Sequence, residues 1–133
     1  MDTNQDIVIP RRKTRLLVAQ LLHGVLRLAH GAYRELPFMQ AVEVTVIVTA
    51  IFSAESEGKP FTALGLSEHL GIPRPTLFRR LSFLRSKGIV HRDAQGLRIN
   101  PQLFMTPNRD KNILQLRKMI IDAGATLVQL GRE

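Results

Sequence analysis

Hydrophobic residues between positions 11 and 36 recur at the three- and four-residue steps of an α-helix. They form two neighbouring seams, Val18-Leu21-Val25-Leu28-Ala32 and Leu22-Leu26-Ala29-Tyr33-Leu36. Together the seams make the predicted N-terminal helix, residues 11–36, apolar over a wide part of its circumference, and such a face needs cover on more than one side. Residues 1–10 show no sustained period. We expect them to form a flexible arm.

The segment 42–52 fits two kinds of structure. Its run of Val, Ile and Thr favours a β-strand by propensity, whereas Val44, Ile47 and Ile51 stand at helical spacing. Helix-tolerant residues bracket the run on both sides, so we predict a helix.

A short helix, a tight turn and a second helix are predicted after residue 60. Thr62 suits a helix N-cap, and Gly71 suits the left-handed turn that ends the helix after Leu70. Pro73 and Pro75 mark the start of the next helix, residues 74–87. Its inward stripe consists of Leu77, Leu81 and Leu84.

Two short strands, Ile89-Val90 and Leu97-Arg98-Ile99, are expected next, around a tight turn at residues 93–96. Residues 108–131 then predict a C-terminal helix with a heptad-like seam. We expect both terminal helices to dimerise the chain, because both are unusually apolar. The residues assigned to this dimer interface are Leu21, Val25, Leu28, Ile113, Leu116, Ile120 and Leu127.

Charge is concentrated in one part of the chain. The protein has 133 residues and a net charge of +8, from 19 Lys and Arg against 11 Asp and Glu. Residues 74–98 hold seven of these cations and a single acid, Asp93. This local surplus favours a polyanion as the partner of that segment.

The order of elements over residues 61–99, two helices joined by a tight turn and followed by two short strands, resembles that of a known module. The run from Leu64 to Leu81, LGLSEHLGIPRPTLFRRL, followed by Leu84, Lys87, Gly88, Ile89 and Val90, resembles the core of bacterial winged helix-turn-helix regulators. The whole layout looks most like the MarR family, and the core is also similar to IclR-type domains. The resemblance implies a mainly α fold in a single domain, residues 11–133. In it, a winged helix-turn-helix core, residues 38–100, ends in a small β-hairpin wing and lies between two dimerisation helices.

The same resemblance implies a function. We expect a cytoplasmic, homodimeric transcriptional regulator that binds double-stranded DNA sequence-specifically, with room for a small-molecule effector. The helix 74–87 would enter the major groove and the short wing, residues 91–99, would contact the DNA backbone. The residues assigned to DNA are Arg74, Pro75, Thr76, Phe78, Arg79, Arg80, Arg92 and Arg98. For Phe78, a place in the core and contact with a thymine methyl group are equally open.

Other classes of function have little support in the sequence. The absence of Cys removes disulfides, thiol chemistry and cysteine-bound zinc. No catalytic triad or glycine-rich phosphate loop is recognisable, so we expect neither an enzyme nor a cofactor or metal site. His23, Arg27 and His30 interrupt the longest apolar stretch, so no membrane partner is predicted. The alternative is a protein-interaction or assembly module on a winged-helix scaffold.

Overall fold

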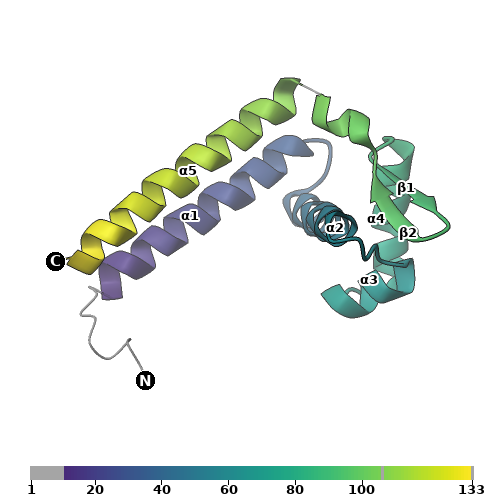
Figure 1. Cartoon of the computed structure of the whole chain (residues 1–133), viewed down its shortest axis with the longest axis horizontal. Helices are drawn as coiled ribbons and strands as arrows, with labels where there is room; N and C mark the ends of the chain where they lie inside the picture. The colour runs from purple at the N-terminus through teal and green to yellow at the C-terminus, as the bar shows by residue number, and fades with distance from the viewer. Residues whose placement is uncertain (1–10, 106, 133) are drawn as a thin grey trace.

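The described part of the chain is mainly helical and has a small antiparallel hairpin. The computed structural model describes residues 11–105 and 107–132, and the predicted flexible arm, residues 1–10, lies outside them. The elements are α1 (Arg11–Ala32), α2 (Phe38–Ser56), α3 (Ala63–Leu70), α4 (Arg74–Ser86), β1 (Val90–Asp93), β2 (Gly96–Ile99), a 3₁₀ helix, η2 (Pro101–Met105), and α5 (Pro107–Arg132). Long helices α1 and α5 lie side by side and project away from the other elements (Figure 1).

Helix α1 ends at Ala32, earlier than the predicted residue 36. The backbone N–H of Tyr33 donates to the carbonyl of His30 at 3.1 Å, and that of Leu36 donates to Tyr33 at 3.0 Å, so the chain leaves the helix in tight turns. Pro37, with φ −55° and ψ 153°, then precedes the first residue of α2. The turn lets α2 leave the direction of α1 and join the core.

The ambiguous β-branched segment is part of helix α2, as predicted. Its buried residues lie at helical steps on one face, and they are Ala41, Val44, Ile47, Ile51 and Ala54. The hydroxyls of Thr45 and Thr49 donate to backbone carbonyls one turn earlier, at 2.8 and 2.9 Å. Burial of one complete helical face therefore outweighs the β propensity of Val, Ile and Thr.

By length and composition, α2 is also the one helix among the described residues that could cross a membrane. The same composition is typical of a core helix. Here α2 packs against α1, α3, α4 and β2, and its two acids, Glu43 and Glu55, form ion pairs with Arg80 and Arg98.

The turn between α3 and α4 is held by specific hydrogen bonds. Thr62 accepts from the N–H of Gly65 at 3.0 Å and caps α3, and Gly71 ends it with φ 69°, both as predicted. The hydroxyl of buried Ser67 donates to the carbonyl of Ile72 at 2.6 Å, which fixes the turn. These contacts set the position at which α4 begins.

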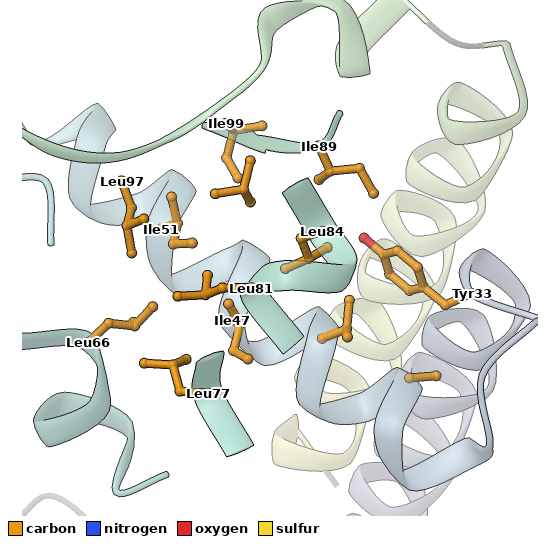
Figure 2. Packing of buried hydrophobic residues seen from close by; sticks show 13 residues of the cluster. Tyr33, Ile47, Ile51, Leu66, Leu77, Leu81, Leu84, Ile89, Leu97 and Ile99 are labelled. Atoms are coloured by element: carbon orange, nitrogen blue, oxygen red, sulfur yellow. The ribbon is translucent and has the colours of Figure 1, made fainter. Parts of the chain in front are cut away.

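The core lies between α2, α3, α4 and the hairpin. Leu66, Leu77, Leu81 and Leu84 meet Ile47 and Ile51 of α2, with Leu97 and Ile99 of the hairpin closing one side (Figure 2). Tyr33, from the turn after α1, also belongs to this cluster. The predicted leucine stripe of α4 is therefore completely buried, and the opposite face of the helix is left for solvent or a partner.

The two strands pair in the register Val90 with Ile99 and Asp93 with Gly96, so the turn itself is Ala94 and Gln95. The hairpin is attached to the body at two points. The N–H of Leu97 donates to the carbonyl of Phe61 at 2.8 Å, and the N–H of Ile99 donates to the Glu55 carboxylate at 3.0 Å. The hairpin is therefore held against the end of α2 and the segment before α3.

Candidate nucleic-acid interface

The outer face of α4 is exposed along its whole length. Because Leu77, Leu81 and Leu84 face the core, the helical period turns other residues outward. The exposed residues of this helix are Arg74, Pro75, Phe78, Arg79, Ser82, Arg85 and Ser86, while Thr76 is half-buried. The structure thus brings five of the six helix residues assigned to DNA from the sequence, Arg74 to Arg79, onto or beside one accessible surface.

Most of the cations in the segment 74–98 make no ion pair with any described residue. The unpaired side chains are Arg74, Arg79, Arg85, Lys87 and Arg92. Arg79 donates through Nη2 to the hydroxyl of Thr76 at 3.3 Å, so its guanidinium is held over the first turn of α4. Lys87 lies 5.8 Å from the centre of the Phe83 ring. We define these five cations as the basic face.

Arg80 does not belong to the basic face. Its Nε donates to Oε1 of Glu43 at 2.9 Å, and only 16% of its side chain is exposed. Arg80 is directed toward α2 because it lies on the flank of the buried leucine stripe. The sequence assigned Arg79 and Arg80 alike to DNA, whereas the structure gives Arg80 an internal partner.

The two arginines of the hairpin differ in the same way. Arg92 is exposed and has no ion-pair partner among the described residues. Arg98 donates to Asp93 at 3.0 Å and to Gln95 at 2.7 Å, and lies 3.6 Å from a carboxylate oxygen of Glu55. Arg98 therefore holds the hairpin to α2, and Arg92 is the hairpin cation that remains available to an external anion.

Asp93 shapes the turn of the hairpin. Its carboxylate accepts from the N–H groups of Gln95 at 2.8 Å and Gly96 at 3.1 Å, as well as from Arg98. The N–H of Gln95, ahead of the other contacts, holds the pKa of Asp93 below its usual 3.8. The one acid of the basic segment is thus used within the hairpin, next to Arg98.

No protein-family model, curated protein or solved structure matches this chain.

Helices α1 and α5 contain the second predicted site, the dimer interface. We use "arm" for α1 and α5 packed on one another, with Ala29, Ala123 and Leu130 buried. Leu21, Val25, Leu28 and Leu116 of the predicted interface are half-buried. Leu21 lines a groove shared with α5 of the same chain, so part of the predicted interface lies within one molecule.

The other predicted residues of α5 face outward. Ile113, Ile120 and Leu127 are exposed, and each is followed in sequence by another exposed large hydrophobic residue, Leu114, Ile121 or Val128. Such pairs, seven residues apart, lie on one side of the helix. The interface predicted from the sequence did not include the second member of each pair, although these residues also repeat every seven positions. On α1, Leu16, Val18 and Leu22 are likewise exposed.

The groove between α1 and α5 is open and has a volume of about 260 Å³. Its lining residues are Leu17, Gln20, Leu21, Met119, Asp122, Ala123 and Thr126. All of these lining residues belong to α1 and α5. The small-molecule effector stays a prediction.

In the part of the chain that the structure describes, histidines and acids do not gather into a metal site. Among residues 11–105 and 107–132, no group of three His, Asp or Glu side chains is placed to hold an ion. His30 shares a hydrogen bond of 3.2 Å with the carbonyl of Leu36 and packs edge-on against Phe38, and His69 packs on Phe61. Both have structural contacts.

Proposed function

We propose that this protein is a sequence-specific, double-stranded DNA-binding transcriptional regulator that acts as a homodimer. The observation that carries the proposal is the basic face of α4 and the hairpin, where five cations have no ion-pair partner among the described residues. An exposed helix of this kind has the width and charge to enter the major groove of DNA. In this proposal α3, α4 and the hairpin form a winged helix-turn-helix.

Each exposed residue has a role that follows from its place on α4. Arg74 and Thr76 lie in the first turn, which reaches deepest into a groove in this docking mode, and contact base edges. Arg79 lies one turn later and contacts phosphate through its planar guanidinium. Arg92, on the hairpin, contacts the DNA backbone beside the helix. Arg80 and Arg98 position α4 and the hairpin from inside the molecule.

The dimer follows from the exposed apolar residues of the arm. Two packed helices leave the paired hydrophobic residues of α5 in water, whereas four helices can enclose such residues in a common core. A second copy of the arm supplies the other two helices. A two-fold dimer then presents two copies of α4 about one helical turn of DNA apart, roughly 34 Å, so the DNA site is an inverted repeat.

Selection of bound fragments from random duplex DNA, with the full chain, tests the proposal. We expect an inverted repeat, and affinity that falls on the order of 10³- to 10⁵-fold between 50 and 200 mM salt for about 6 to 10 phosphate contacts.

A pair of variants tests the basic face. Arg79→Ala should weaken DNA binding, whereas the control Lys118→Ala should not, because Lys118 is an exposed cation on the arm, paired with Asp122 at 3.1 Å. Loss of binding in both variants alike, or no salt-sensitive DNA retention, contradicts the proposal. Co-purification with an acidic protein in place of DNA favours the interaction module.

A further inference from the structure

Phe78 is a large apolar side chain on the exposed side of α4, between Arg74 and Arg79 of the basic face in sequence. It is 51% exposed, so the structure removes the core position that the sequence left open. Its ring makes no aromatic or cation–π contact with any described residue. Between Arg74 and Asn100, Phe78 is the one exposed large hydrophobic residue; the others of the described chain lie on α1, α2, α3 and α5.

The neighbours of Phe78 place it on the surface that faces the proposed DNA. Pro75 and Ser82 lie three residues before it and four residues after it, so the three share one stripe of α4, and all are exposed. Arg79, next in sequence, extends from the adjacent stripe. A helix that inserts Arg74 and Thr76 into the major groove therefore brings the Phe78 ring to the groove as well.

The chemistry of the major groove offers few partners for a phenyl ring. Base edges present hydrogen-bond donors and acceptors, and phosphates present charge, neither of which a phenyl ring satisfies. The C5 methyl group of thymine is the apolar group in this groove, and Phe is one of the side chains that contact it. We propose that Phe78 contacts a thymine methyl group, so that each half of the DNA site requires a methyl group at one position.

The inference rests on the proposed function, and its test starts from the DNA site selected above. Each thymine of the site is replaced in turn by deoxyuridine, which keeps base pairing and removes only the methyl group. We expect one position in each half-site to lose affinity about fourfold, the contribution of one buried methyl group. At that position, a pair of 5-methylcytosine with guanine should bind about fourfold tighter than unmethylated cytosine with guanine.

Variants of the protein connect this effect to Phe78. In Phe78→Ala the difference between thymine and uracil should disappear, while Phe78→Leu, which stays apolar, should keep part of it. Leu64→Ala is the matched control, since Leu64 is 44% exposed but lies on α3 outside the basic segment, and it should keep the full difference.

The failures of the two proposals are distinguishable. DNA binding that is indifferent to every uracil, or a uracil effect that survives in Phe78→Ala, overturns the thymine contact and leaves the regulator proposal intact. Tighter Phe78-dependent binding to single strands than to duplex also overturns it, since the ring then stacks on bases. Absence of DNA binding by the wild-type chain overturns both.

Discussion

Arg80 donates through Nε to Oε1 of Glu43 at 2.9 Å, an ion pair that ties α4 to α2 across 37 positions of sequence. The adjacent Arg79 is exposed, and its side chain donates to the hydroxyl of Thr76 of its own helix. Two neighbouring arginines of the same chemistry thus have different partners, which separates a contribution to stability from the proposed contribution to DNA binding.

We expect Arg79→Ala and Arg80→Ala to affect different measurements. Arg80→Ala leaves the half-buried Glu43 carboxylate without its partner and should lower the free energy of unfolding in urea by about 1 to 3 kcal/mol. Arg79→Ala should leave stability within about 0.5 kcal/mol of wild type. It should also reduce the slope of log affinity against log salt by about 1 for each phosphate that the guanidinium neutralises. A stability loss in Arg79→Ala equal to that of Arg80→Ala would refute this division.

The exposed pairs of α5 predict the oligomeric state. Ile120→Asp and Leu127→Asp each place a charge on the apolar side of α5 that α1 leaves uncovered, so both variants should sediment as monomers at micromolar concentration. Their inverted-repeat DNA binding should weaken in parallel. Gln129→Asp introduces the same charge at an exposed position beside Leu127 and Val128 that is already polar, and this control should stay dimeric. A wild-type chain that is monomeric under these conditions contradicts the arm interface.

At Gly96, the addition of a single methyl group should destabilise the protein. The φ of Gly96 is +147°, and a Cβ atom there would lie 2.5 Å from the carbonyl oxygen of Phe61, which itself accepts from Leu97. Gly96→Ala should destabilise the protein by about 1 to 3 kcal/mol or more through backbone strain alone, measured by thermal unfolding. Gly31→Ala is the control, because Gly31 is helical and nothing lies near its added Cβ. That variant should be neutral or up to about 1 kcal/mol more stable.

The lowered pKa of Asp93 predicts how its contribution to stability changes at acidic pH. Because the folded hairpin, first through the N–H of Gln95, lowers the pKa of this carboxyl below 3.8, its contribution to stability is fully present above pH 3.8. That contribution is lost as the pH falls below 3.8 and through the pKa of the folded state. Amide NMR shifts of Gln95 and Gly96 should titrate below 3.8 in wild type, and Asp93→Asn should abolish the titration. A midpoint at or above 3.8 would show that these hydrogen bonds do not form in solution.

Local signals in the sequence were sufficient for most of the secondary structure. The caps at Thr62 and Gly71 and the helical spacing of Val44, Ile47 and Ile51 each depend on residues within one or two turns. The structure bears out these elements and the mainly α class with its small hairpin. The end of α1 was placed four residues too late, because the apolar period continues to Leu36 while the backbone turns at Tyr33 to bring α2 into the core.

What the sequence determined by itself was the set of elements and the concentration of charge in residues 74–98, because periodicity, capping and composition act locally along the chain. Only the tertiary structure decided which of those charges are free. Arg80 and Arg98 are paired by Glu43 and Glu55, and Phe78 is exposed while Leu77 is buried. Ion pairing and burial at these positions depend on which distant element packs on each side of a helix. The local pattern of the sequence does not specify that packing.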